Sequence, residues 1–145
     1  MEKKPVNVQL NDFSLKNVYF DLQKCEENKE YKIQFLDDIA INIIDEVSFS
    51  ILYTRKAFNE SPFKLEVSYG VTVRADKSGL EQNNETIEQF ADRKKQDIVR
   101  KVAFPSRASV LISEITRESG SVLVTVPGII TNKQKGEVDN GGEKN

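Results

Sequence analysis

A regular alternation of apolar and polar residues in the middle of the chain is its clearest structural signal. Between residues 63 and 75 every second position is apolar, with Gly70 or a polar residue at each position between. Successive side chains of a strand point to opposite faces, so this pattern predicts one long strand with an apolar and a wet face. Because a single strand cannot bury its own apolar face, neighbouring strands and a covering layer are expected. The apolar positions are Phe63, Leu65, Val67, Tyr69, Val71, Val73 and Ala75.

The segment from Val6 to Leu22 predicts another strand, with an irregularity in its middle. Its apolar residues alternate at first, and the alternation slips between Phe13 and Val18. Such a slip predicts a bulge or bend, because one extra residue moves all later side chains to the other face. A polar crossover at residues 23–30 follows.

Two more strands are predicted at about residues 31–43 and 46–57, where isoleucine, valine and aromatic residues alternate with polar ones. The acidic pair at residues 45–46 is the expected turn between them, and the pair at residues 37–38 is the competing break. Residues 59–62, Asn-Glu-Ser-Pro, predict the next turn, since Asn and Ser favour turns and Pro cannot donate to a central ladder. This turn joins the second of these strands to the central one as an antiparallel hairpin.

The period of the pattern changes after a loop predicted at residues 76–84. Pro105 suits the first turn of a helix that Gly120 is placed to close. Because Pro disrupts a helix interior, the pattern predicts either one helix kinked at Pro105 or two helices that meet there. Apolar residues recur near helical spacing at Ile87, Phe90, Ile98 and Val102, and then at Ala108, Val110, Leu111, Ile112 and Ile115.

Strands followed by helices, without βαβ alternation, predict an α+β domain over residues 1–130. The expected architecture is a four-stranded antiparallel sheet followed by a long, Pro-kinked helix. Residues 121–130 are expected to be extended, and the polar, glycine-rich residues 131–145 predict a disordered tail. Helices on one face of such a sheet leave apolar residues exposed on edges and helix backs, so we expect a homo-oligomer, a dimer or a tetramer.

Composition excludes more functions than it indicates. The 145 residues suit one domain, and a net charge of −2 with acids and bases well mixed gives no attraction to nucleic acid or an anionic membrane. No apolar run is long enough for membrane insertion, and the charged N-terminus lacks the apolar region of a signal peptide, so a cytoplasmic protein is expected. The one cysteine, Cys25, lies beside Glu26 and Glu27, which disfavour its thiolate.

No enzyme, catalytic residue, metal ligand or cofactor is predicted. The chain has no histidine, so it has neither a Cys/His zinc site nor a Ser-His-Asp or Cys-His pair. Adjacent carboxylates on a strand point apart, so the pairs at residues 37–38 and 45–46 are interpreted as turn or surface residues. Most aromatic residues are assigned to core packing.

The residues from Phe104 onwards form a recognisable series. Phe104-Pro105 lead into a helical segment from Ser109 to Ile115, a stop follows at Thr116-Arg117 and Gly120, and the extended segment Val124-Thr125-Val126-Pro127 comes next. With the order of elements, and a strand containing Tyr69-Gly70-Val71 before the helix, this series resembles the SecB protein-export chaperones. The family's C-terminal helix and its acidic outer sheet face have no counterpart here, so docking to a translocation motor is not carried over.

The resemblance implies an ATP-independent holdase without a cofactor, which keeps unfolded or partly folded polypeptides from aggregating. It also implies a dimer of dimers in which the long helices meet. The alternative hypothesis is an oligomeric interaction or scaffold module without general client binding, or one dedicated to a single protein partner. An enzyme or small-molecule role is the weakest hypothesis.

Candidate residues follow from the same resemblance, with ordinary core or subunit packing as the competing interpretation. The expected client-binding residues flank the polar crossover and lie in the last extended segment: Leu22, Tyr31, Ile33, Phe35, Val122, Val124 and Val126. The expected oligomer interface is the helical stripe Val110, Leu111 and Ile115.

Overall fold

The computed structural model describes residues 2–22, 33–58, 63–118, 123–130, 136–137 and 139–140. Within these ranges, the long strands are β1 Val8–Leu22, β2 Gln34–Ile43, β3 Ser48–Phe58 and β4 Phe63–Ala75. The helices in the same ranges are α1 Lys77–Gln82, α2 Ile87–Lys101 and α3 Phe104–Arg117. Two-residue strands follow, β5 Leu123–Val124, β6 Gly136–Glu137 and β7 Asp139–Asn140.

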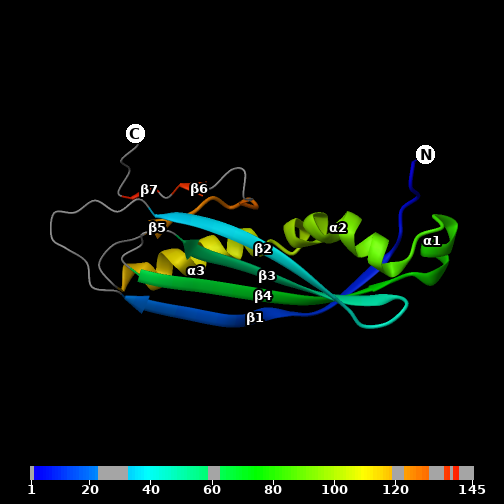
Figure 1. Ribbon diagram of the computed structural model, residues 1–145, viewed down its shortest axis with the longest axis horizontal. Helices are drawn as coiled ribbons and strands as arrows, with labels where there is room; N and C mark the ends of the chain where they lie inside the picture. The colour runs from blue at the N-terminus through cyan, green and yellow to red at the C-terminus, as the bar shows by residue number, and fades with distance from the viewer. Residues whose placement is uncertain are drawn as a thin grey trace.

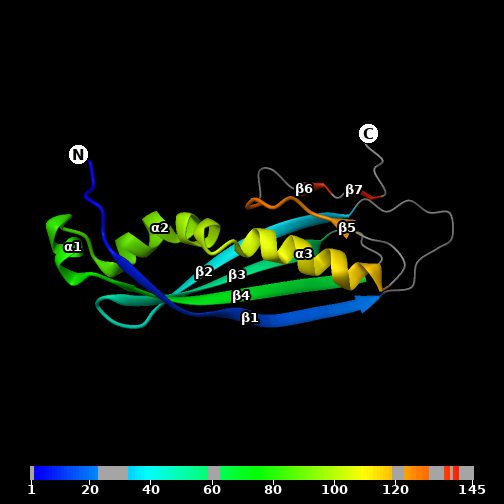
Figure 2. The same cartoon turned by 180° about the vertical axis from the view of Figure 1, so that it is seen from behind.

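The long strands form one antiparallel sheet, and α2 and α3 lie on one of its faces (Figure 1; Figure 2). The strand order is β1-β4-β3-β2, with the short β6 beyond β2. Helix α2 packs on β2 and β3, whereas α3 packs on β3 and β4. The α+β class and the four-stranded antiparallel sheet predicted from the sequence are therefore confirmed. We call the sheet face that carries the helices the inner face and the opposite one the outer face.

The predicted central strand is β4, which has the predicted bounds and pairs with β1 on one side and β3 on the other. Its alternate side chains form the middle of the core under the helices. Aromatic rings join the two layers. Phe104, at the start of α3, stacks on Tyr69 with ring centroids 5.3 Å apart and on Tyr53 at 6.2 Å. Phe90 of α2 meets Phe49 of β3 edge to face at 6.3 Å.

The predicted irregularity in the first strand is present in β1. Its register against β4 shifts between Asn11 and Ser14 and again between Leu15 and Asn17. Asp12 lies in the first of these shifts with a φ of 55°, a conformation that Asp tolerates better than most residues. From Asn17 to Leu22 the pairing is regular.

The hairpin of β2 and β3 turns at the acidic pair of residues 45–46. The Ile44 amide donates to the Ser48 carbonyl at 2.9 Å, and the Val47 amide donates to Asp45 Oδ1 at 2.9 Å. Strand β2 continues through residues 37–38, so the competing break at that pair was wrong. Strands β3 and β4 pair antiparallel as predicted, while the expected turn at residues 59–62 lies outside the described residues.

The loop predicted at residues 76–84 is wrong over residues 77–82, which form helix α1. Asp76 caps this helix, because its side chain accepts from the Gly79 amide at 3.2 Å. Gly79 weakens the helical pattern in the sequence, but it makes room for Val6: a Cβ added at Gly79 would lie 3.1 Å from Val6 Cγ1. Leu80 is buried and attaches the helix to the core.

The helical region consists of two helices that are separated at Val102 and Ala103, so the second arrangement considered is present and the expected long, Pro-kinked helix is not. Ala103 has a φ of 61° and precedes α3, with Pro105 in the first turn. A continuous helix would need a hydrogen bond from the amide of residue 105 to the Lys101 carbonyl, which Pro cannot donate. None of the described helices is long and apolar enough to cross a membrane.

An ion pair joins the connection between α1 and α2 to the body of α2. Glu85 is buried and accepts from Arg93 through both carboxylate oxygens, with each N···O distance 2.8 Å. The Arg93 guanidinium also lies over the Phe90 ring, 5.5 Å from its centroid. The hydrogen bond from Arg93 is the main reason why the pKa of Glu85 lies below its ordinary value.

We predict that Glu85→Gln lowers the free energy of unfolding at neutral pH by about 1–2 kcal/mol. The native pKa of Glu85 is the depressed one, so the pair stabilises fully above the ordinary value of 4.5 and its contribution disappears as pH falls through the native pKa. Urea unfolding at neutral and acid pH measures this, with the exposed Glu88→Gln as control. A loss of the same size at both pH values would contradict the assignment.

Candidate functional site

A buried ion pair lies where the β2–β3 hairpin meets the last extended segment of the chain. Arg55 occupies an inner-face position of β3, and the β-ladder places it opposite Asp37 of β2. Its Nε lies 2.7 Å from Asp37 Oδ1 and its Nη2 lies 2.8 Å from Asp37 Oδ2, a bidentate arrangement with both side chains fully buried. The interpretation of Asp37 as a turn or surface residue was therefore wrong, whereas Asp38 is exposed.

The remaining hydrogen bonds of this pair fasten residues 125–130 to the sheet. Arg55 donates to Thr125 Oγ1 at 2.8 Å and to the carbonyls of Val126 and Gly128 at 2.6 Å each. The Ile130 amide donates to Asp37 Oδ2 at 2.8 Å, and the Asp37 amide donates back to the Ile130 carbonyl at 3.0 Å. We call residues 123–130 the C-terminal segment. Its path along β2 depends on these contacts.

The Tyr53 hydroxyl lies in the same buried region and has no hydrogen-bond partner among the described residues. Burial is the largest cause of its raised pKa, and the nearby Asp37 carboxylate raises it further. The hydroxyl therefore stays protonated at neutral pH. We therefore interpret Arg55 and Asp37 as a structural ion pair.

The fastening of Thr125 turns its two neighbours outwards. Val124 and Val126 are 52% and 45% exposed, because alternate side chains of an extended segment point to opposite sides. Ser109 of α3 donates to the Thr125 carbonyl at 2.6 Å, which brings the segment beside the helix. Val110, the next residue of α3, is 58% exposed. We call these three exposed valines the C-terminal patch.

A second exposed apolar surface lies on β1. Leu15 and Val18 are 46% and 42% exposed on the inner face, opposite Tyr69 and Val67 of β4. Tyr19 is 49% exposed on the outer face, and Phe13, also 49% exposed, lies in the irregular region. We call these four residues the β1 strip. Phe13 and Tyr19 are exceptions to the core packing expected of most aromatic residues: Tyr19 projects on the face opposite α2 and α3, and Phe13 lies where the register of β1 shifts.

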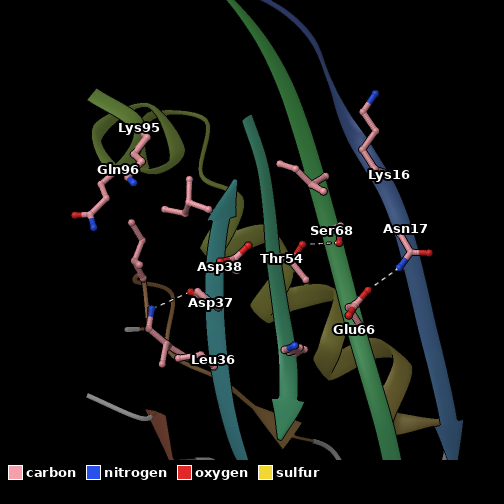
Figure 3. Close-up of a pocket in the computed structure, with 15 residues that line it drawn as sticks. Lys16, Asn17, Leu36, Asp37, Asp38, Thr54, Glu66, Ser68, Lys95 and Gln96 are labelled. Atoms are coloured by element: carbon pink, nitrogen blue, oxygen red, sulfur yellow. Dashed lines mark hydrogen bonds between the residues drawn. The ribbon is translucent and has the colours of Figure 1, made fainter. Parts of the chain in front are cut away.

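A shallow hollow of about 730 Å³ is lined by residues of all four long strands, with Lys95 and Gln96 of α2 and with Ile129 and Ile130 of the C-terminal segment (Figure 3). Thr54 and Ser68 share a hydrogen bond of 2.8 Å between their hydroxyls, and Asn17 donates to Glu66 at 3.2 Å. Lys16 crosses Gly70, where an added Cβ would lie 2.8 Å from Lys16 Cε. These two pairs bond four of the polar residues of the hollow to one another.

The structure divides the predicted client-binding residues between core and surface. Ile33 and Phe35 are buried in the core, whereas Val124 and Val126 are exposed. Leu22 ends β1, where its backbone pairs with Phe63 of β4. Tyr31 and Val122 lie outside the described residues.

The predicted oligomer interface is divided in a similar way. Val110 is exposed on the back of α3, whereas Leu111 and Ile115 are half-buried and pack against the core of their own chain. Of the three predicted interface residues, Val110 alone lies on the surface.

Sequence reasoning missed the Arg55–Asp37 pair and the β1 strip as features. A signal for the pair was present: a hairpin that turns at residues 45–46 puts positions 37 and 55 opposite each other, and Arg55 stands at an inner position of its strand. For the strip, the signal was the presence of apolar residues on both faces of a strand whose alternation slips. No family model, curated protein or solved structure matches this chain. The resemblance to the SecB chaperones therefore stays a prediction from the sequence.

We predict that Asp37→Asn lowers the free energy of unfolding by about 3–5 kcal/mol, because it leaves the Arg55 charge buried without its counter-ion. Asp38→Asn is the matched control, an exposed carboxylate on the other face of the same strand. Urea unfolding measures both variants, and the combined change Asp37→Leu with Arg55→Met is expected to recover most of the loss. Equal, small effects of the two Asn variants would contradict a structural role for the pair.

Proposed function

We propose that this protein is an ATP-independent holdase that binds unfolded or partly folded polypeptides, as the resemblance to the SecB family implies. The observation that carries the proposal is that a chain with a well-packed core exposes two separate apolar surfaces, the β1 strip and the C-terminal patch. Large apolar side chains grouped on a soluble protein mark a surface that binds protein or another apolar partner.

The apolar side chains of the β1 strip and the C-terminal patch suit clients without fixed structure. Aliphatic and aromatic side chains make contacts that tolerate many sequences, whereas hydrogen-bonded pockets select one ligand. Charged residues such as Lys16 lie beside the β1 strip, and these keep the free protein in solution while the apolar side chains make the contact.

We predict that the protein suppresses aggregation of a chemically denatured client diluted into buffer without nucleotide, at equal molar amount. Val18→Lys is expected to raise the amount needed for half-suppression about fivefold, since it removes the burial of half a valine side chain, worth roughly 1 kcal/mol. The matched control is Leu52→Lys, a residue of β3 with similar exposure, 41% against 42% for Val18. Light scattering reads out both variants, and no suppression by the folded wild-type protein would refute the holdase function.

The second candidate function is an oligomeric scaffold module, and the exposure of Val110 on the back of α3 favours it. A helix that presents a valine outwards beside two exposed valines of an extended segment offers a compact apolar contact for a second copy of the chain. A homo-oligomer is also compatible with holdase activity, so the two candidates differ in what the β1 strip does.

We predict that Val110→Asp lowers the native molar mass of the protein by dissociating its oligomer, because the substitution places a charge among the exposed valines of the C-terminal patch. Val110 is a better test position than Leu111 or Ile115, whose replacement would also disturb the core. Size-exclusion chromatography with light scattering measures the mass, and Ile44→Asp, an equally exposed change at the β2–β3 turn, is the control. An unchanged mass for Val110→Asp would exclude this patch as an oligomer interface.

A further inference from the structure

The outer face of the sheet carries apolar side chains that none of the described helices covers. Helices α2 and α3 both lie on the inner face (Figure 1; Figure 2). On the outer face, Tyr19 of β1 and Leu52 of β3 expose 49% and 41% of their surface. Charged residues such as Lys56 and Asp38 are exposed beside them. What this face fits is decided by the order of its side chains across the strands.

The outer face is organised in rows that cross all four long strands in the order β1-β4-β3-β2. The ladders place the members of a row directly opposite one another. One row consists of Tyr19, Glu66, Lys56 and Leu36. The next row consists of Asn17, Ser68, Thr54 and Asp38. Figure 3 shows this second row running from β1 to β2.

The first row complements itself when its order is reversed. A two-fold axis that runs parallel to the strands, between β3 and β4, would bring a second sheet face to face with the first. Each residue of β4 would then lie over the β3 residue of its own row, and each residue of β1 over that of β2. Glu66 of one copy meets Lys56 of the other, and the symmetry forms this ion pair twice. At the ends of the row, Tyr19 meets Leu36, an apolar contact.

The neighbouring rows pair in the same way. Asn17 of one copy meets Asp38 of the other, so an amide group faces a carboxylate. One row further along, Leu52 stands opposite Gly70 in the ladder and therefore meets Gly70 of the second copy. Lys16 crosses this glycine with its methylene groups, which offer Leu52 an apolar surface. Charged, polar and apolar positions thus each meet a position of matching chemistry.

The charges of the first row are available for a second copy. Lys56 and Glu66 lie opposite each other in the ladder, yet no ion pair joins them within the described part of one chain. Asn17 donates to one oxygen of the Glu66 carboxylate. A two-fold axis across the strands would instead place each residue of the row that it crosses over its own copy, Lys56 over Lys56 or Asp38 over Asp38. Such like charges repel, so the parallel axis is favoured.

We propose that the outer face is a symmetric interface between two copies of this chain, centred on the ion pairs between Lys56 and Glu66. Packed sheets keep their strands within about 30° of each other, so the match is closest in the central rows. Nine residues of β3 across four strands span roughly 30 Å by 19 Å, or roughly 600 Å² a copy. An area of this size indicates weak, reversible association. The inference does not depend on the holdase function, which Val18 tests on the inner face.

Two charge reversals test the interface in a chain that also carries Val110→Asp, so that the C-terminal patch adds no association. Lys56→Glu and Glu66→Lys are each expected to weaken dimer formation about tenfold or more, because each places two pairs of like charges across the interface. Mixing the two reversed chains is expected to restore the dimer, since every Glu then faces a Lys again. Sedimentation velocity from micromolar to millimolar concentration measures the mass, and Lys77→Glu, an exposed change at the start of α1, is the control.

Lysine acetylation gives a second measurement without charge reversal. In the Val110→Asp chain, Lys56 is expected to react more slowly as the protein concentration rises, while Lys77 reacts at a constant rate. If this chain stays monomeric at every concentration, the interface is overturned and the outer face is left to a partner of another sequence. A mixture of the reversed chains that associates no better than each alone also overturns it, as does a dimer that neither reversal weakens. Suppression of client aggregation is measured separately and is left standing by these failures.

Discussion

The pairing of Arg55 with Asp37 is the interaction on which the arrangement of the chain's last part depends. A fully buried guanidinium needs a counter-ion and partners for its N–H groups, and the structure supplies these from β2 and from the C-terminal segment. The segment is therefore held by charge and backbone hydrogen bonds, with Thr125 turned inwards. The exposure of Val124 and Val126 follows from the inward position of Thr125, because consecutive side chains of an extended backbone point to opposite sides.

The sequence allowed the strands to be predicted because each carries a two-residue period, and β4 even has the predicted bounds. The pair Arg55–Asp37 was missed because a sequence shows neighbours along the chain, whereas partners depend on where a hairpin turns, and two turns had been left open. Helix α1 was missed for a different reason. Its Gly79 reads as a loop residue, although the structure uses it for the close approach of Val6. Period alone cannot show such tertiary contacts.

The candidate surface was harder to predict than the fold, for a related reason. Alternation shows that Phe35 and Val124 each belong to an apolar face, but it does not show what covers that face. Phe35 is fully buried in the core. Val124 is exposed, because it belongs to the C-terminal segment, whose Thr125 is hydrogen-bonded to Arg55. Likewise, Phe13 and Tyr19 resemble core residues in sequence, but Tyr19 projects on the outer face and Phe13 lies in the irregular region of β1.

The two edges of the sheet differ in what lies along them, and this difference bears on how the sheet could associate with other chains. A sheet with both edges open would let bound segments extend it in two directions, which is the geometry of fibre growth. Here the chain's own segments lie on β2, whereas β1 ends the strand order of the described sheet. The register shifts between Asn11 and Asn17 also shorten the regular part of that edge. A short ladder limits the number of backbone hydrogen bonds that this edge could form with another strand, and each contributes only about 1 kcal/mol net.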